Sequence, residues 1–128
     1  MALKNILEAI NFSIDQQMEK DESVVVFGED AGFVGGVFRV TAGLQKKYGD
    51  QRVFDTPISE AAIVGAGIGM AAAGLKPIVE IQFSGFMLPA YNQIVAHAAR
   101  LRNRSRGKYH VPMVIRMPYG GGVKALEH

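Results

Sequence analysis

Short apolar runs alternate along this chain with longer segments of helical periodicity, and this alternation constrains the fold more than any other feature. Val24 to Phe27 is a β-branched and aromatic run that ends at Gly28, which is typical of a strand buried on both faces. Further strands are expected over residues 53–54, 77–83 and 111–117, and helices over 3–20, 40–48, 60–73 and 88–105. This order predicts an α/β domain with an open, mainly parallel sheet that carries helices on both faces.

Residues suited to helix ends support these boundaries. Asn5 is followed by Glu8 three residues later, which is the pattern of a capping box. Ser59 is the expected N-cap of the third helix. Gly49 and Gly74 are expected to end the second and third helices, because glycine readily adopts the left-handed conformation that follows a helix.

The extent of the expected sheet bears on the domain organisation. The chain has 128 residues, the size of one domain. Four strands are few for such a sheet, and nothing in the sequence after Gly122 would cover its last edge. We therefore expect residues 1–123 to form a domain that is incomplete at its C-terminal end. Residues 124–128 are then a tail, either native loop or the remnant of an expression tag.

The composition excludes several classes of protein. There is no cysteine, which rules out disulfide bridges, cysteine-ligated metals and thiol nucleophiles. The longest apolar run, Ala61 to Leu75, is mostly Gly and Ala and too short to span a bilayer. The N-terminus is neither a signal peptide nor an Arg-rich transit peptide. We expect a soluble protein of a bacterial or archaeal cytoplasm, without a membrane partner, or of the mitochondrial matrix if the chain is processed.

Five cations fall within nine residues, from Arg100 to Lys108, and no acid lies among them. On a helix, their every-second-residue spacing would place them in two stripes on opposite sides. A nucleic-acid-binding face would instead gather its charge on one side and interleave aromatic residues. A subunit contact is therefore favoured, with a solvated helix end as the plain alternative. An RNA- or DNA-binding domain is the least favoured of the three, and no nucleic acid is expected as a partner.

Two patterns suggest a ligand but fail on their context. Gly67 to Ala72 matches the glycine pattern of dinucleotide-binding loops, yet a helix precedes it and no acid lies about 20 residues further on. Gly65, Gly69 and the neighbouring alanines are instead expected to give the helix a smooth face for close packing. His97 lies within a helix, and no His–carboxylate cluster has metal-site spacing, so no metal ligand is expected.

The loops after the strands hold the candidate site residues, because ligands of open parallel sheets bind at the carboxyl ends of the strands. That edge offers one carboxylate, Glu60, one amide, Gln82, and one aromatic ring, Phe86, with few positive charges for phosphates. Each has a plainer explanation, since the helix dipole favours an acid in a first turn and burial favours a phenylalanine. From these residues alone, a non-catalytic, flavodoxin-like α/β binding module remains an alternative to an enzyme.

Ordered motifs along the chain are similar to those of one enzyme family. The motifs are Gly28-Glu29-Asp30-Ala31-Gly32, Gly35-Gly36-Val37-Phe38-Arg39, Asp55-Thr56-Pro57-Ile58-Ser59-Glu60, Gly74 to Glu80, and Arg116 to Gly122. They resemble the beta subunit of the thiamine-diphosphate-dependent 2-oxoacid dehydrogenases, the decarboxylating first component of their complexes. The likeness runs from Leu3 to Val123 and implies the pyrimidine-binding domain of that family.

The resemblance implies roles for five residues. Glu60 matches the glutamate that hydrogen-bonds N1′ of the cofactor's aminopyrimidine, where a shared proton favours the imino form that deprotonates the thiazolium ring. Phe86 matches the aromatic residue that stacks on the pyrimidine, and Ile58 and Gln82 match neighbouring ring contacts. His128 stands at or beside a histidine that contacts the reacting intermediate, unless it belongs to a tag.

The resemblance also implies partners and a reaction. An alpha subunit would hold the diphosphate of thiamine diphosphate through Mg²⁺ in an α2β2 heterotetramer. The enzyme would decarboxylate a 2-oxoacid, pyruvate or a branched-chain one, and pass the acyl group to a lipoyl acyltransferase. Because this chain would carry half of the site, it is expected to be inactive alone.

Overall fold

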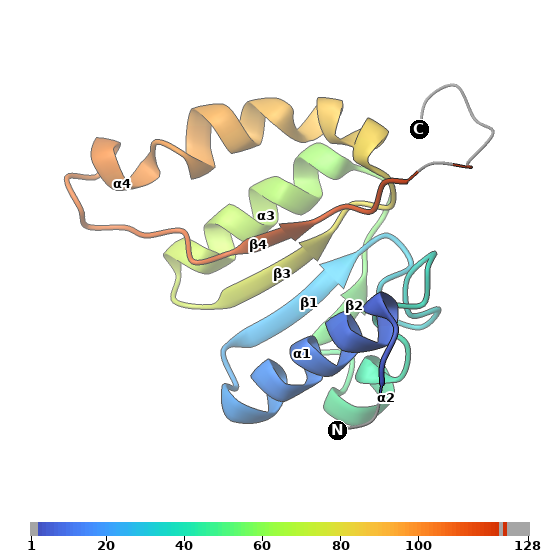
Figure 1. Cartoon of the computed structure of the whole chain (residues 1–128). Coiled ribbons are helices and arrows are strands. Elements are labelled where there is room, and N and C mark those ends of the chain that lie inside the picture. The colour runs from blue at the N-terminus through green and yellow to red at the C-terminus, as the bar shows by residue number, and fades with distance from the viewer. Residues whose placement is uncertain (1–2, 121, 123–128) are drawn as a thin grey trace.

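A parallel sheet forms the centre of the molecule in the computed structural model, which describes residues 3–120 and 122. Its four strands lie in the order β2-β1-β3-β4, and all of its neighbouring pairs are parallel. The strands are β1 (Val24–Gly28), β2 (Val53–Asp55), β3 (Lys76–Glu80) and β4 (Val114–Arg116). Their carboxyl ends therefore meet at one edge (Figure 1). The expected open, parallel α/β sheet is confirmed.

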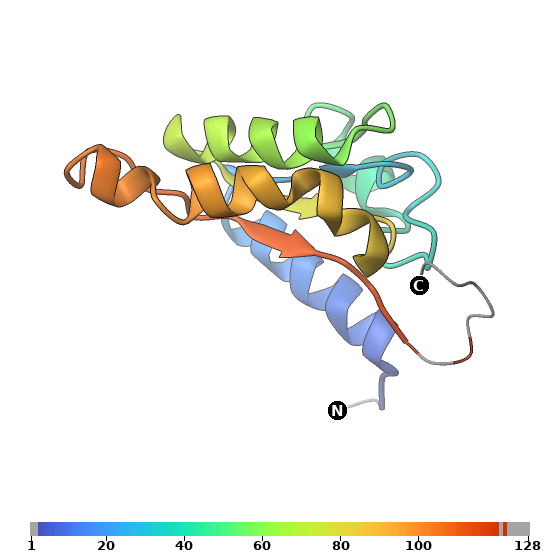
Figure 2. The ribbon, with the colours of Figure 1, turned by 90° about the horizontal axis from the view of Figure 1, so that it is seen from above.

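Helices cover both faces of this sheet (Figure 1 and Figure 2). One face carries α1 (Ile6–Lys20) and α2 (Leu44–Tyr48). The other carries α3 (Glu60–Ala72), with the 3₁₀ segment η1 (Ser84–Ala90) and the π-helical segment η2 (Gln93–Ala98) packed beside it. The short α4 (Leu101–Arg104) projects beyond the sheet.

Each face has its own core, because the central strands are apolar on both sides. Val25 and Phe27 of β1 pack with Val64 on the α3 face, while Val24 and Val26 pack with α1 and α2 on the other. All five positions of β1 are buried, as expected for a strand covered on both faces.

The ends of the helices follow the sequence in part. The capping box of α1 is confirmed, with Glu8 N donating to Asn5 Oδ1 at 2.9 Å and Asn5 N donating to Glu8 Oε2 at 3.0 Å. Ser59 occupies the N-cap position of α3, but its side chain makes no capping hydrogen bond, so that part of the prediction is wrong. The Ser59 carbonyl still accepts the first helical bond, from Ile63 N.

The helix predicted over residues 88–105 is wrong as a single element. It is divided into η1, η2 and α4, and it begins four residues earlier, at Ser84. Pro89 has no N–H to donate, which prevents a regular α-helical start. Further on, Ala99 N donates to the Ile94 carbonyl five residues back, a π-type bond that widens the helix.

Other boundaries also differ from the expectation. The helix predicted over 3–20 begins at Ile6, and the one predicted over 40–48 begins at Leu44, because Gly43 is left-handed with φ +83°. The strands predicted over 77–83 and 111–117 shorten to Lys76–Glu80 and Val114–Arg116. The predicted strands were too long because apolar residues continue past the paired residues, after β3 and on both sides of β4.

Close packing of α3 on the sheet depends on Gly67, and the packing role predicted for Gly69 is wrong. Gly65 faces η2, since a Cβ on it would lie 3.5 Å from Gln93 Oε1. A Cβ on Gly67 would lie 2.9 Å from both Val79 Cγ1 and Met113 Cε, whereas one on Gly69 would meet nothing within 4 Å. The glycine pattern therefore serves packing at its buried member, Gly67, and the exposed Gly69 has no such role.

Candidate functional site

The strand order brings four of the five predicted site residues to one edge of the sheet. Glu60 begins α3 just after β2, while Gln82 and Phe86 follow β3. Since β1 lies between β2 and β3, the acids that follow it, Glu29 and Asp30, lie between these two groups. The edge is therefore a row that runs from one carboxylate, through two acids, to an amide and an aromatic ring.

Glu29 is the buried member of this row. Its side chain belongs to a residue that is only 5% exposed, and Glu29 Oε1 has no hydrogen-bond partner among the described residues. Burial raises the pKa of Glu29, the negative charges of Glu60 and Asp30 raise it further, and the backbone amide of Ser59 opposes them. Glu29 is thus close enough to Glu60 for their charges to interact, at the start of α3.

On the β3 side of β1, the edge of the sheet is lined by an amide and by aromatic rings. Gln82 Nε2 donates to Asp30 Oδ2 at 2.9 Å, which ties the loop after β3 to the loop after β1. The Phe86 ring meets Phe83 edge to face at 5.7 Å between centroids, and Phe83 meets Phe38 in the same way at 5.6 Å. Phe86 is half-buried and packs against the core of the α3 face, so its structural role is evident beside any role in binding.

Ile58 and His128 are the two remaining predicted site residues, and the structure describes only the first. Ile58 lies between β2 and α3 and is 84% exposed, so a large apolar side chain stands free beside Glu60. His128 lies outside the described residues, and its predicted role stays a prediction.

Hydrogen bonds between the loops fix this edge. Asp55 accepts from Gly32 N at 2.6 Å and from Phe33 N at 3.0 Å, so the end of β2 holds the loop after β1. Gly28 ends β1 where a Cβ would lie 2.2 Å from the Glu80 carbonyl oxygen of β3. Only glycine permits that approach. The two acids of the site, Glu29 and Asp30, follow Gly28 directly.

A buried ion pair supports the same edge from the β4 side. Glu80 and Arg116 face each other in the β3–β4 register, with Arg116 Nη2 3.0 Å from Glu80 Oε1 and Arg116 Nε donating to Glu80 Oε2 at 3.2 Å. The first contact is close but poorly aligned for a hydrogen bond, so it acts as an ion pair. Burial raises the pKa of Glu80, and the charge of Arg116 opposes that rise.

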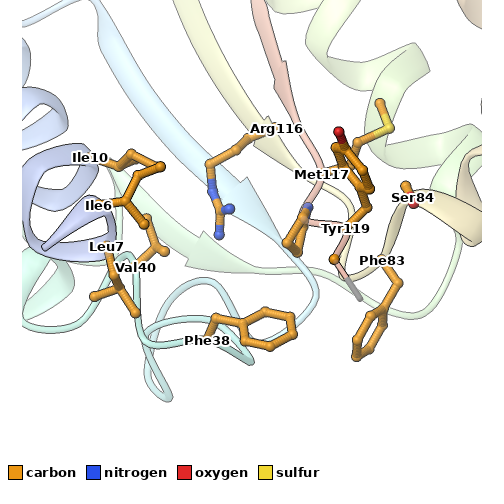
Figure 3. A pocket seen from close by; sticks show the side chains of 12 residues that line it. Ile6, Leu7, Ile10, Phe38, Val40, Phe83, Ser84, Arg116, Met117 and Tyr119 are labelled. Carbon is orange, nitrogen blue, oxygen red and sulfur yellow. The ribbon is translucent and has the colours of Figure 1, made fainter. Parts of the chain in front are cut away.

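A separate hollow lies between α1 and the end of β4 (Figure 3). It has a volume of about 500 Å³ and contains none of the predicted site residues. Its lining is mainly aliphatic and aromatic, and the Arg116 guanidinium points into it from the Glu80 pair. This hollow lacks the row of acids and amide that distinguishes the edge above β1.

Sequence reasoning named Glu29 within a motif but gave it no role, and it missed the Glu80–Arg116 pair. The signal for Glu29 was its place directly after a strand buried on both faces, where a carboxylate is enclosed by neighbouring loops. The signal for Glu80 was a lone acid in an apolar strand, which requires a buried partner. Its partner could be named only with the strand register.

Within the part of the chain that the structure describes, no three His, Asp or Glu side chains are grouped as ligands of a metal ion. None of its helices has both the length and the apolar character needed to cross a membrane.

Replacing Glu29 by glutamine is expected to raise the melting temperature at pH 7 by a few degrees, because it removes a buried charge beside two other acids. A raised carboxyl pKa means that the folded state holds the proton more tightly than the unfolded chain does. The wild type therefore loses stability as the pH rises above the ordinary value of 4.5. Thermal melts of both proteins should converge near that pH and separate above it. A variant less stable than wild type at pH 7 would contradict this.

Comparisons with known proteins show which family this chain is similar to. Residues 4–128 match the family model described as transketolase, pyrimidine binding domain. The chain is 72% identical over all of its 128 residues to the pyruvate dehydrogenase E1 component subunit beta of Acholeplasma laidlawii, of which it covers 39%. It is 63% identical over 97% of its length to the protein of that name in Mycoplasma pneumoniae, covering 38% of it. It is 56% identical over 92% of its length to the 2-oxoisovalerate dehydrogenase subunit beta of Pseudomonas aeruginosa, covering 34% of it. The chain thus spans less than two fifths of the length of these relatives.

Proposed function

Because the chain belongs to the transketolase pyrimidine-binding family, we propose that its sheet edge is the pyrimidine half of a thiamine-diphosphate site in the beta subunit of a 2-oxoacid dehydrogenase. One observation carries the proposal. Glu60 starts α3 at the carboxyl ends of the strands, beside the buried Glu29, while the amide of Gln82 and the ring of Phe86 close the same row.

The residues of the edge fit an aminopyrimidine ring. Such a ring needs a hydrogen-bonding group at its edge and apolar contacts on its faces. Glu60 offers the first, and Ile58 and Phe86 offer the second, with Ile58 exposed for contact. Buried polar atoms without a partner among the described residues, Glu29 Oε1 and Thr56 Oγ1, also occur in the loops of this edge. An orphaned buried polar atom is costly unless something pairs with it, and a bound polar ring is such a partner.

Each residue has a definite task under this proposal. Glu60 shares a proton with pyrimidine N1′, which sets the tautomer of the ring. Gln82, held by Asp30, and Phe86 fix the position of the ring, while Ile58 excludes water from its face. The bound cofactor supplies the carbon nucleophile that a 2-oxoacid decarboxylation needs.

The proposal assigns the diphosphate and its Mg²⁺ to an alpha subunit, in an α2β2 heterotetramer. Glu29, Asp30 and Glu60 give the edge negative charge, which would repel a diphosphate. The substrate is a 2-oxoacid, pyruvate or a branched-chain one, since relatives named for both are similar to this chain. A lipoyl acyltransferase accepts the acyl group, and the setting is a bacterial cytoplasm. His128 would contact the reacting groups.

The test is whether activity depends on both subunits. We would co-express the beta polypeptide that carries this chain with its alpha subunit and measure 2-oxoacid-dependent dye reduction with thiamine diphosphate and Mg²⁺. We expect activity in the co-expressed protein and none in the 128-residue chain alone. Decarboxylation by the chain alone at enzyme rates would refute the half-site. A thermal shift with flavin mononucleotide but none with thiamine diphosphate in the assembled protein would favour a flavodoxin-like binding module instead.

A further inference from the structure

The turn that joins η2 to β4 carries a dense set of unused positive charges. We call it the basic turn, and its cations are Arg100, Arg102, Arg104, Arg106 and Lys108. All five are exposed, and none forms an ion pair with a residue that the structure describes. Arg104 alone has a side-chain hydrogen bond to the protein, a long one of 3.4 Å to the Ala96 carbonyl. Lys108 Nζ lies over the Tyr109 ring, 5.4 Å from its centroid. The other three cations, Arg100, Arg102 and Arg106, therefore have charged groups available to a partner.

The backbone of the basic turn is held in one conformation. Gly107 N donates to the Arg102 carbonyl at 2.8 Å, and Arg106 N donates to the Asn103 carbonyl at 3.0 Å. Arg106 and Gly107 are both left-handed, with φ of +53° and +81°. A non-glycine residue in that region is uncommon, and here these internal bonds hold it there. The cations are thus presented on a preorganised scaffold, which lowers the entropic cost of binding.

Two of the arginines line one hollow. Arg102 and Arg106 do so together with Asn103, Ala99 and Gly107. Both arginines carry a positive charge, and like charges repel each other. A carboxylate in the hollow would relieve that repulsion, and the planar guanidinium fork matches carboxylate geometry.

The basic turn is separate from the candidate cofactor site. α4 lies at the end of the molecule opposite the carboxyl ends of the strands (Figure 1), and it projects past the helices in the second view (Figure 2). Between Ile81 and Leu126 the sequence has seven basic residues and no acidic one, whereas the first eighty residues have eleven acidic and seven basic ones. The positive charge is therefore concentrated in one part of the sequence, while residues 1–80 have an excess of acids.

We propose that the basic turn is a docking surface for an acidic polypeptide, a partner protein that presents clustered Asp and Glu side chains. A small acidic patch complements a small basic one. A long nucleic acid would extend past the turn onto a chain that otherwise has twelve acidic and nine basic residues, and that net negative charge repels its phosphates. Tyr109, 41% exposed, directly follows Lys108 and adds a tyrosine to the arginines, a mixture that is enriched in protein interfaces.

The experiment measures binding of a fluorescent oligo-glutamate peptide to the intact chain by anisotropy, at two salt concentrations. We expect binding that weakens with salt and falls about tenfold or more in Arg102→Glu/Arg106→Glu. Arg102→Lys/Arg106→Lys keeps the charge but loses the fork, so a loss of a few-fold is expected. The matched control, Lys20→Glu/Lys46→Glu, reverses two exposed cations elsewhere and should leave binding unchanged.

Three outcomes would overturn the proposal. One is equal binding by the lysine variant and wild type, which would show that the turn attracts the peptide by its charge alone and has no specific binding geometry. Another is tighter binding of an oligonucleotide of equal charge. The third is self-association, detected by sedimentation, that disappears in the glutamate variant, because a second copy would then be the occupant. Glu60→Gln should leave peptide binding unchanged, so this test and that of the proposed function fail independently.

Discussion

Replacing Arg116 by methionine is expected to destabilise the fold by about 3–5 kcal/mol, the usual effect of removing one partner of a buried ion pair. Glu80 is 2% exposed and lies opposite Arg116 in the register of β3 and β4. Without the guanidinium, the Glu80 carboxylate keeps its desolvation cost and loses its counter-charge. Chemical denaturation at pH 7, read by circular dichroism, measures the difference in the free energy of unfolding.

The pH dependence separates this cause from lost packing. Burial already raises the pKa of Glu80, and removing Arg116 would raise it further. A carboxyl with a raised pKa favours folding at low pH, and that advantage is lost as the pH rises from its ordinary value of 4.5 through the raised one. The deficit of Arg116→Met should therefore be small near pH 4.5 and grow toward pH 7. A deficit that does not vary with pH would show that packing around Arg116, and not the charge of Glu80, is responsible.

A double variant provides the matched control. Glu80→Gln with Arg116→Met removes both charges, so most of the lost stability should return at pH 7. The Glu80 carboxylate lies close to Gly36, where even an added Cβ would be 2.9 Å from Glu80 Oε1. Glutamine has the size of glutamate, so it fits at position 80 without a new contact with Gly36. A double variant as unstable as Arg116→Met alone would mean that the pair is not coupled.

The regular elements of the fold were readable from local patterns. The capping residues Asn5 and Glu8 start α1 as expected, and the buried β1 ends at Gly28. These features depend on residues close together in sequence, whose propensities and hydrogen bonds act within one turn or one strand. The parallel orientation of the strands was predicted from the same alternation of strands and helices.

Other features depended on contacts that no local pattern records. The region 84–105 has helical periodicity, but Pro89 and the π-type bond at Ala99 divide it. Likewise Gly67, and not Gly69, is the glycine that meets the sheet, because Gly67 lies on the side of α3 that faces Val79 of β3. The Glu80–Arg116 pair exists because β3 and β4 are neighbours in one register, which the sequence does not specify.

The site shows the same division between local and tertiary information. Glu60 at the start of a helix is a local feature, and so is the place of Gln82 and Phe86 after a strand. That Glu29 is buried beside Glu60, and that Asp30 holds Gln82, requires the order β2-β1-β3. Sequence reasoning therefore named the outer members of the row and gave no role to the buried acid between them.

Replacing Glu60 by glutamine should lower 2-oxoacid-dependent dye reduction about 100-fold or more in the assembled enzyme, equivalent to roughly 2.7 kcal/mol of barrier. A glutamine amide can contact the pyrimidine but cannot share a proton with its N1′. The measurement is the steady-state rate of the beta polypeptide co-expressed with its alpha subunit, after gel filtration confirms assembly.

The control for this substitution is Glu19→Gln, which makes the same change at an exposed position of α1, away from the edge. It should retain wild-type activity and assembly. If Glu60→Gln also retained activity, the carboxylate would serve only the dipole of α3, an effect of about 0.3–1 kcal/mol on stability. Loss of assembly in Glu60→Gln would instead place Glu60 in a subunit contact. Activity lost with assembly intact requires a group that handles a proton, and at this edge Glu60 is the half-buried acid that starts α3.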